Sequence, residues 1–224
     1  MAIVAGPGLL WMPSHQPDAL IFDLDGTLWD TCTACARAWN QSLAALGIGG
    51  YSIQTEDIRQ VAGLPHAACI AQVFAGLPAD QQAALIAHTA SSDLQAIRQW
   101  GGQLYPGVTE GLKTLSQHVP LFIVSNCQAG YIALFLAQEQ LHDYVVDHLC
   151  WGDTNQSKAQ NLTQIIARHQ LKKAVYIGDT VGDAEAAADC GLPFWFASWG
   201  FGRPTRYDRS LSTFAEIQTL LTAL

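Results

Sequence analysis

Two pairs of aspartates stand where the sequence predicts strands to end. Asp23 and Asp25 follow the apolar run Ala-Leu-Ile-Phe, within the segment DLDGTL (residues 23–28). Asp179 and Asp183 follow a second apolar run, Ala-Val-Tyr-Ile-Gly. Carboxylates grouped in this way can supply oxygen ligands to a hard cation such as Mg²⁺. Because aspartate and glycine are also common turn residues, and Asp183 could cap a helix, neither pair decides a function alone.

Two further signals are weaker when each is taken alone. Ser125 and Asn126 follow the apolar run Pro-Leu-Phe-Ile-Val. A hydroxyl and free backbone N–H groups at a strand end can hold a phosphoryl oxygen, but Ser-Asn is also ordinary turn or helix-cap chemistry. Lys158 stands at the start of an expected helix, although most lysines are solvated surface charges. Each feature indicates a function only in combination with the other motifs.

Taken together, these residues predict a site for a phosphate group. Ligands of an open parallel sheet bind outside the carboxyl ends of its strands, so turns far apart in sequence converge on one crevice. Four carboxylates in that crevice would carry several like charges, which is costly without compensation. Mg²⁺ and the Lys158 ammonium together supply three positive charges. The compensated site can then accept a phosphate dianion, which an acidic cluster alone would repel.

The elements that must position these residues alternate between strand and helix on either side of a helical stretch. From residue 31 to about 101, apolar residues recur at spacings of three and four, punctuated by glycine and proline, which predicts an insert of about four helices. Elsewhere, short apolar runs alternating with helical patterns predict a parallel sheet covered on both faces. The expected strands are 19–22, 120–124, 145–149, 174–177 and 193–197, and the expected helices are 108–117, from about 129, 158–169 and 182–190.

Composition narrows the class of protein. The chain has 224 residues, of which 50% are hydrophobic and 13% charged, with a net charge of −8. An acidic chain does not favour nucleic acid as a partner, because phosphate backbones bind basic faces. No uninterrupted apolar run reaches membrane-spanning length, and residues 1–18 predict an irregular extension that lacks the positive start of a signal peptide. Six scattered cysteines favour reduced thiols over a disulfide framework, and we expect a cytoplasmic protein.

The chain resembles the haloacid dehalogenase superfamily of phosphohydrolases, in its phosphoglycolate phosphatase-like branch. The four motifs of that superfamily stand in order, and the resemblance runs from about residue 19 to the C-terminus. The segment 198–202 (SWGFG) also looks like a stretch of its relatives, with Trp199 in place of tyrosine. The resemblance implies an α/β fold: a Rossmann-like core over 19–31 and 104–224, with a helical cap over 32–103. The motifs are Asp23-x-Asp25-Gly26-Thr27, Ser125-Asn126, Lys158, and Gly178-Asp179 with Asp183.

The same resemblance implies a role for each motif residue. Asp23 would attack phosphorus and form an aspartyl-phosphate, while Asp25 would protonate the leaving oxygen and later activate water. Mg²⁺ would be held by a carboxylate oxygen of Asp23, the backbone carbonyl of Asp25, and Asp179. The phosphoryl group would be held by Ser125, Asn126 and Lys158. Asp183 and Thr27 would hold these site residues in place without contacting the metal or the phosphate themselves.

Within the superfamily, the motifs favour a phosphatase over its neighbours. Phosphonatases use a cap lysine, and residues 31–104 contain none. Dehalogenases lack the second aspartate of the first motif, which is present here as Asp25. β-Phosphoglucomutase-like enzymes carry a histidine where this chain has Cys35, which disfavours phosphoryl transfer but leaves it as an alternative. A non-catalytic phosphometabolite-binding protein on the same fold is a further alternative.

The substrate is less closely defined by the sequence. We expect a small phosphorylated metabolite, a phosphoglycolate-like monoester, acted on by a monomer or homodimer. Cap residues could read a carboxylate or hydroxyl groups on it, although solvated surface arginines would look the same. These candidates are Arg37, Arg59, Arg98, His66 and the turn over 63–65 (Gly-Leu-Pro).

Overall fold

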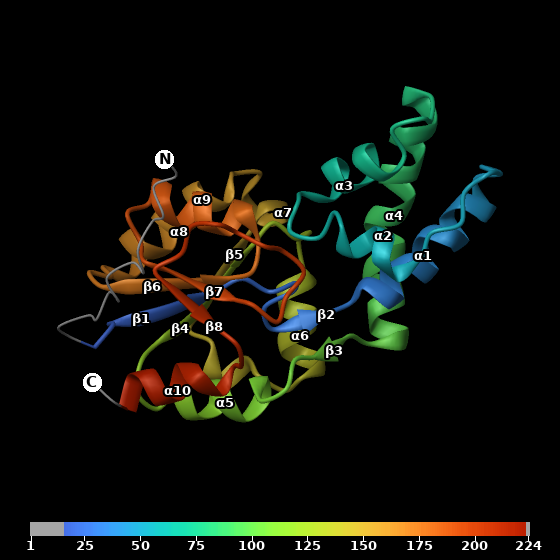
Figure 1. Ribbon diagram of the computed structural model, residues 1–224. Helices are drawn as coiled ribbons and strands as arrows, with labels where there is room; N and C mark the ends of the chain where they lie inside the picture. The colour runs from blue at the N-terminus through green and yellow to red at the C-terminus, as the bar shows by residue number, and fades with distance from the viewer. Residues whose placement is uncertain (1–15, 223–224) are drawn as a thin grey trace, which may run out of the picture.

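A six-stranded parallel sheet forms the centre of the molecule in the computed structural model, which describes residues 16–222 (Figure 1). Strand β1 lies between β4 and β6, so the chain winds outward from it in both directions. The α/β Rossmann-like fold that the sequence predicted is confirmed. The strands, in spatial order, are β5 (Asp147–Cys150), β4 (Leu121–Ser125), β1 (Ala19–Phe22), β6 (Ala174–Gly178), β7 (Phe194–Ala197) and β8 (Arg209–Leu211).

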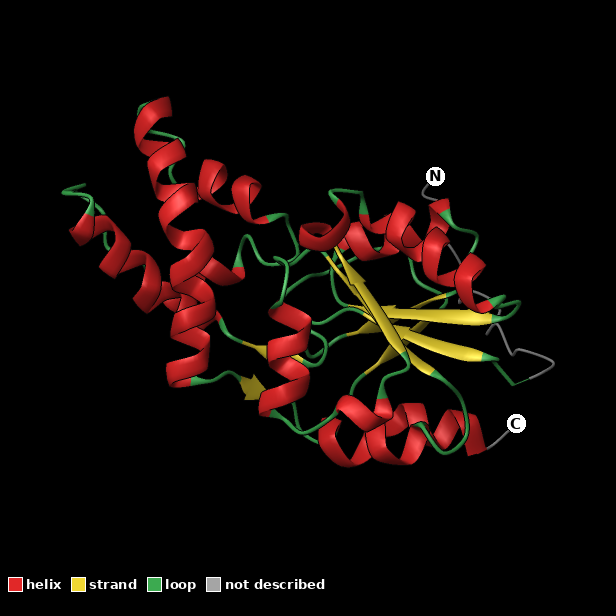
Figure 2. Cartoon of the chain, turned by 180° about the vertical axis from the view of Figure 1, so that it is seen from behind, coloured by secondary structure: helices red, strands yellow, loops and turns green. Residues whose placement is uncertain are grey.

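Helices cover both faces of this sheet (Figure 2). Leu20 and Phe22 of β1 pack into one core cluster with α5 (Val108–Leu115), α6 (Tyr131–Gln138) and α10 (Ala215–Thr222). The alternate residues of β1, Ala19 and Ile21, pack into the opposite cluster with α8 (Lys158–His169) and α9 (Val181–Asp189). All four side chains are buried, as expected for a central parallel strand with helices on both sides.

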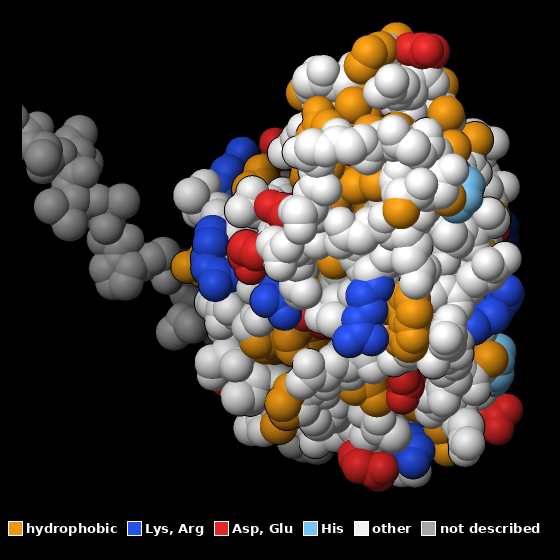
Figure 3. All heavy atoms as spheres, turned by 90° about the vertical axis from the view of Figure 1, so that its right-hand side faces the viewer, with side chains coloured by type: hydrophobic (Ala, Val, Ile, Leu, Met, Phe, Trp, Pro, Cys, Tyr) orange, Lys and Arg blue, Asp and Glu red, His pale blue; other side chains and the backbone are white. Residues whose placement is uncertain are grey.

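Four helices stand beyond the carboxyl ends of the strands. The chain leaves the core through β2 (Trp29–Asp30) and returns through β3 (Gln103–Leu104), which pair antiparallel. The helical segment has its own core, in which the Trp39 ring packs at a tilt against Phe74. Figure 3 views the molecule from this side and shows positive and negative side chains interspersed on that face. The helices are α1 (Cys32–Ala45), α2 (Thr55–Arg59), α3 (His66–Val73) and α4 (Ala79–Trp100).

The sequence-based element boundaries are close to the observed ones, with differences at short elements. The helix expected over 158–169 has those bounds, whereas β4 begins one residue later than expected and ends on Ser125 instead of before it. The sequence did not predict β8 or α10. The short helices η1 (His142–Tyr144) and α7 (Trp151–Thr154) also went unpredicted.

Three composition-based expectations meet the structure in different ways. All six cysteines are free thiols, as expected. Within residues 16–222, no helix is long and apolar enough to cross a membrane. Most of the expected extension over 1–18 lies outside the described residues. At its end, the Asp18 carboxylate accepts backbone hydrogen bonds from Lys172 and Lys173 at 2.6 and 3.0 Å, just before β6.

The last part of the chain closes the core under β1. The Phe214 ring stacks on Phe22 with centroids 5.8 Å apart, and a Cβ added to Gly111 would lie 2.2 Å from that ring. Phe214→Ala should therefore lower the free energy of unfolding by about 3–5 kcal/mol, because it removes a buried ring and leaves a cavity. Denaturant melts measure this. Val146→Ala, at a side chain exposed by 58%, is the control and should change stability by about 0.5 kcal/mol or less. A loss below about 1 kcal/mol for Phe214→Ala would contradict this packing.

Candidate active site

The first two motif aspartates leave the end of β1 in a tight turn. Asp23 is fully buried, and its backbone N–H donates to Ile177 O at 2.8 Å, which fixes it against the neighbouring strand. Gly26 has a φ of +82°, a conformation that other residues rarely adopt. A Cβ at Gly26 would lie 2.4 Å from Asp179 Oδ2. The turn can therefore bring the first motif against Asp179 only with glycine at this position.

Lys158 is the only lysine or arginine at the centre of the described site, and it bridges two carboxylates. Its Nζ lies 3.0 Å from Asp23 Oδ1 and 2.5 Å from Asp183 Oδ1, and the side chain is 5% exposed. A capping box between Ser157 and Gln160 starts helix α8 at this residue and aims its side chain. Burial alone would lower the pKa of Lys158, but the charges of Asp183 and Asp23 outweigh burial and raise it. The ammonium is therefore held charged.

Asp183 is saturated with hydrogen bonds. Its Oδ2 accepts from the backbone N–H of Asp179 and from the N–H and hydroxyl of Thr180, and its Oδ1 accepts from Tyr176 Oη at 3.0 Å. Burial opposes ionisation of Asp183, but Lys158 outweighs it and lowers the pKa. Every Asp183 oxygen is thus engaged with the protein, which suits a residue that orients Lys158 and Asp179.

Asp179 is held from two sides at the end of β6. Its Oδ2 accepts from the backbone N–H of Phe201 at 2.8 Å and of Gly202 at 3.2 Å, and Thr27 Oγ1 donates to its Oδ1 at 3.2 Å. Burial and the nearby Asp183 charge raise the pKa of Asp179 to about 7. A cation placed beside this carboxylate would offset the burial and the charge repulsion, and would therefore favour the ionised form of Asp179.

The acidic cluster has the donor chemistry of a divalent cation site. One oxygen each of Asp23, Asp179 and Asp183 lies within 4.8 Å of the others. Asp23 Oδ2 is buried and has no hydrogen-bond partner among the described residues, although Oδ1 is bound by Lys158. Burial and Asp183 raise the pKa of Asp23, and Lys158 only partly opposes them. Crowded carboxylates of this kind fit a hard cation such as Mg²⁺.

Asp25 faces a different environment from Asp23. Its Oδ1 accepts a hydrogen bond of 2.6 Å from Tyr131 Oη, and Tyr131 Oη also lies 2.6 Å from Thr31 Oγ1. Burial raises the pKa of Asp25 to about 6, although the Tyr131 hydrogen bond works in the opposite direction. A carboxyl group in this range exchanges a proton readily near neutral pH, which suits general acid–base chemistry.

Ser125 and Asn126 lie at the end of β4, next to β1. Ser125 is buried as the last residue of the strand. The side-chain amide of Asn126 donates to Gly63 O at 2.8 Å, in the loop between α2 and α3. Asn126 therefore joins the sheet edge to the helical segment above it. The structure brings all eight sequence-predicted site residues to the same edge of the sheet, at the ends of β1, β4 and β6 and the starts of α8 and α9.

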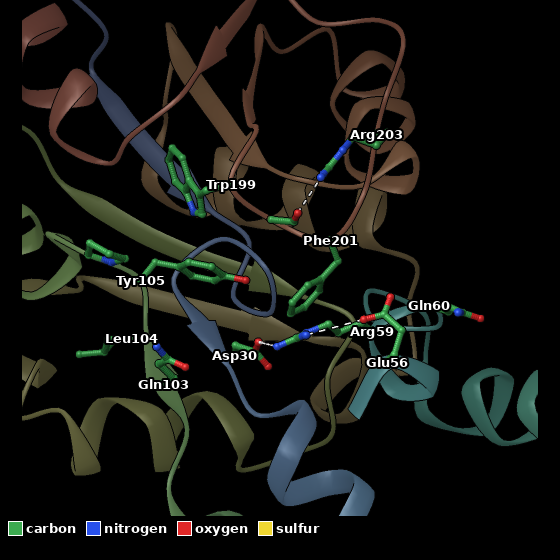
Figure 4. Close-up of a pocket in the computed structure, with 12 residues that line it drawn as sticks. Asp30, Glu56, Arg59, Gln60, Gln103, Leu104, Tyr105, Trp199, Phe201 and Arg203 are labelled. Atoms are coloured by element: carbon green, nitrogen blue, oxygen red, sulfur yellow. Dashed lines mark hydrogen bonds and ion pairs between the residues drawn. The ribbon is translucent and has the colours of Figure 1, made fainter. Parts of the chain in front are cut away.

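A wider cleft of about 450 Å³ lies beside the strands that connect the two parts of the chain (Figure 4). Arg59 extends into it between Asp30 and Glu56, and its Nη2 lies 2.9 Å from Asp30 Oδ2. The guanidinium also lies over the Phe201 ring, 6.0 Å from its centroid. This cleft does not include Asp23, Asp25 or the other carboxylates of the acidic cluster.

The sequence model of the haloacid dehalogenase-like hydrolase family matches residues 20–197 of this chain. The chain belongs to the haloacid dehalogenase-like hydrolase family. It is 32% identical to the phosphoglycolate phosphatase of Rhodobacter capsulatus over 192 residues, 82% of this chain and 85% of the relative. It is 31% identical to that of Synechococcus elongatus over 191 residues, 82% and 84% of the two chains. The resemblance found from the motifs is thus confirmed, and with it the class of phosphoric monoester hydrolases.

Solved structures agree with this membership at the level of fold. A predicted phosphoglycolate phosphatase from Haemophilus somnus superposes with a TM-score of 0.82, covering 92% of this chain and 99% of the other, at 18% identity. A haloacid dehalogenase-like hydrolase from Bacteroides fragilis gives a TM-score of 0.78, covering 90% and 100%, at 22% identity. The sheet with its inserted helices is therefore the architecture of this hydrolase family.

Two parts of this hydrolase's site escaped the sequence analysis. Tyr131 carries no motif and stands in an apolar helix, so no local signal predicted its hydrogen bond to Asp25. From the sequence, the segment 198–202 showed only a resemblance to a stretch of the family, whereas the structure shows what it contacts. Its backbone N–H groups hold Asp179, and Trp199 Nε1 donates to Thr27 O at 3.0 Å.

Gly200 offers a test of how this hydrolase positions Asp179. A Cβ there would lie 2.3 Å from Gly26 O and 2.4 Å from Asp179 Cβ. Gly200→Ala should displace Asp179 and weaken the binding of any divalent cation at the acidic cluster, tested with Mg²⁺, about tenfold or more, the usual effect of disturbing what holds a metal ligand. Titration calorimetry measures this. Gly49→Ala, which meets nothing within 4 Å, is the matched control. Equal Mg²⁺ affinity in both variants would contradict the role of this contact.

Proposed function

We propose that this hydrolase is a magnesium-dependent phosphatase that cleaves small phosphate monoesters through a phosphorylated Asp23. One observation carries the proposal: Asp23 presents a buried carboxylate oxygen without a partner, while Lys158 fixes the other oxygen. A carboxylate held in this way is oriented for attack and is not itself consumed by a hydrogen bond. The family membership and the curated phosphatase relatives support the same reaction.

The proposed reaction has two steps. In the first, Asp23 Oδ2 bonds to phosphorus, the ester P–O bond breaks, and Asp25 gives its proton to the departing oxygen. In the second, Asp25 accepts a proton from water as the water oxygen bonds to phosphorus, which releases phosphate and restores Asp23. Lys158 and Ser125 hold the phosphoryl oxygens during both steps.

Magnesium has a defined place in this proposal. It would be held by the Asp23 oxygen that does not attack phosphorus, by Asp179 and by the backbone carbonyl of Asp25, and Asp183 and Thr27 would keep these ligands in place. The bound ion would supply positive charge next to the phosphoryl oxygens. Support comes from the raised pKa values of Asp23 and Asp179, whose crowded negative charge a cation would relieve.

The helical segment has the position of a cap. We assign residues 32–103 to it and residues 19–31 and 104–224 to the catalytic core. The Asn126 side chain bonds Gly63 O, and Gln138 Nε2 bonds Ile97 O at 3.1 Å, so the segment rests on the core at two places. A cap placed there would keep bulk water away from the phosphorylated aspartate. Phosphoglycolate is the reference substrate, because the curated relatives carry its name.

Asp23→Asn tests the nucleophile. The amide cannot attack phosphorus, so turnover of p-nitrophenyl phosphate with Mg²⁺ should fall at least about a thousandfold. Circular dichroism should show an intact fold, because the amide keeps the shape of the carboxylate and Lys158 keeps Asp183. Asp189→Asn, at an exposed position of α9, is the control with the same chemical change. Near-normal activity of a folded Asp23→Asn variant would overturn the assignment.

Cys35 bears on whether the phosphoryl group goes to water or to a sugar. Burial raises the pKa of this thiol well above its usual value, and Thr31 Oγ1 lies 3.7 Å from the sulfur. A neutral thiol is a weak donor and a poor acceptor, so it cannot couple sugar binding to Asp25. We therefore expect β-glucose 1-phosphate, if turned over, to give free phosphate and glucose in equal amounts. Phosphorus NMR decides this, and accumulation of glucose 6-phosphate would instead identify a mutase.

A further inference from the structure

A small cavity lies between the catalytic core and the helical segment. Its volume is about 90 Å³. Asp25 and Tyr131 line it from the core, and Cys35, His66 and Asp93 line it from the helices. Under the proposed function, Asp25 protonates the departing oxygen, so the leaving group of the ester must occupy the space next to it. The chemistry of this lining therefore decides which leaving groups fit.

The described residues that line this cavity include no lysine or arginine. The three cap arginines lie elsewhere. Arg37 is exposed and stacks over the Trp100 ring, and Arg98 is exposed on α4. Arg59 pairs with Asp30 in the separate cleft of Figure 4. A carboxylate on the leaving group would thus meet no cation in the cavity, and such groups are bound in proteins by arginine or lysine.

His66 does not replace the missing cation. Thr89 donates its hydroxyl proton to Leu85 O at 2.7 Å, so its oxygen accepts from His66 Nε2 at 2.9 Å. The ring nitrogen that carries the proton is therefore engaged with the helix. Burial lowers the pKa of His66, which keeps the ring neutral. The histidine offers the cavity no positive charge.

Asp93 presents an oxygen at this cavity that has no hydrogen-bond partner among the described residues. The side chain is buried on α4, 4% exposed, and its Oδ2 accepts from Trp39 Nε1 at 3.2 Å and from Gln128 Nε2 at 3.5 Å. The same Oδ2 lies 3.5 Å from Nε2 of His66, which is a neutral partner while its lowered pKa keeps the ring uncharged. Asp93 Oδ1 is buried with no hydrogen-bond partner among the described residues. Burial raises the pKa of Asp93 to about 7. Nearly all buried polar atoms are paired in folded proteins, so an unpaired carboxylate oxygen in a cavity points to a missing donor.

We propose that the cavity holds the leaving group of the phosphate ester, and that Asp93 Oδ1 accepts a hydrogen bond from an ammonium or hydroxyl group on it. This inference rests on the proposed function and narrows its substrate class. The chain should prefer phosphate esters of amino alcohols or diols to phosphoglycolate, whose carboxylate would face Asp25 and Asp93 without a counter-charge. An ammonium group would also neutralise the buried Asp93 charge.

Four two-carbon esters test the ranking in the wild-type protein. Ethanolamine phosphate, ethylene glycol monophosphate, ethyl phosphate and phosphoglycolate differ only in the group that would reach Asp93. At mildly alkaline pH with Mg²⁺, kcat/KM for the better of the first two should exceed that for phosphoglycolate at least about tenfold. Comparison of kcat/KM for ethanolamine phosphate and ethylene glycol monophosphate shows whether Asp93 prefers an ammonium or a hydroxyl donor.

The outcomes separate the two proposals. A preference for phosphoglycolate over the donor-bearing esters would overturn the inference and leave the phosphatase proposal intact. Failure to hydrolyse any of the four esters or p-nitrophenyl phosphate with Mg²⁺ would overturn the phosphatase proposal itself. Each result is read from the wild-type chain and needs no variant that could misfold.

Asp93→Asn then tests the residue. The amide retains the size of the carboxyl group and an acceptor for Trp39, but it removes the charge. The ratio of kcat/KM for the preferred donor-bearing ester to that for ethyl phosphate should fall about tenfold or more. Asp80→Asn, at an exposed position of the same helix, should keep the wild-type ratio. An unchanged ratio in a folded Asp93→Asn variant would overturn the role of Asp93.

Discussion

Burying several carboxylates around one ammonium is the constraint on which the rest of the site depends. Lys158 bridges Asp23 and Asp183 in the interior, and removing one partner of such a buried pair typically costs about 3–5 kcal/mol. The neighbouring groups satisfy the oxygens that Lys158 does not reach. Tyr176 and the backbone of Thr180 bind Asp183, and the backbone of 201–202 binds Asp179. Glycines let these segments approach. Within residues 16–222, Asp23 Oδ2 is the one buried oxygen of these three carboxylates without a hydrogen-bond partner, and it is the atom proposed to attack phosphorus.

Parallel strand order explains how much of this was predictable. Phe22 pairs with Ile177 in adjacent strands, so the carboxylates that follow β1 and β6 meet at one edge, as the apolar runs and motifs predicted. Contacts made by side chains on distant helices could not be predicted, because no motif or apolar run marks these residues in the sequence. Tyr131 comes from an apolar helix over a hundred residues from Asp25, and Asp93 is one polar residue on an amphipathic helix, where a solvated position is the ordinary expectation. Strand β8 is only three residues long, too short to show a period.

The two ends of the site differ in electrostatic character. At the phosphoryl end, Lys158 and the proposed Mg²⁺ balance the carboxylates, and this arrangement follows the motifs of the family. At the leaving-group end, thiols, a neutral His66 and Asp93 surround a cavity without a cation. Under the proposed function, the motifs bear on the chemistry of the reaction, and residues of α3 and α4 bear on the choice of substrate. One fold can combine such separate determinants of reaction and specificity.

Covalent trapping at Asp23 tests the central claim most directly. An acyl phosphate is reduced by borohydride to the alcohol, whereas a free carboxylate is not. The protein is quenched during turnover with Mg²⁺, treated with tritiated borohydride, and digested for peptide mapping. If Asp23 is the nucleophile, one labelled residue is expected, homoserine in place of Asp23, and it appears only when substrate is present. Label at Asp25 or Asp179, or no label from a protein that is turning over, would contradict a phosphorylated Asp23.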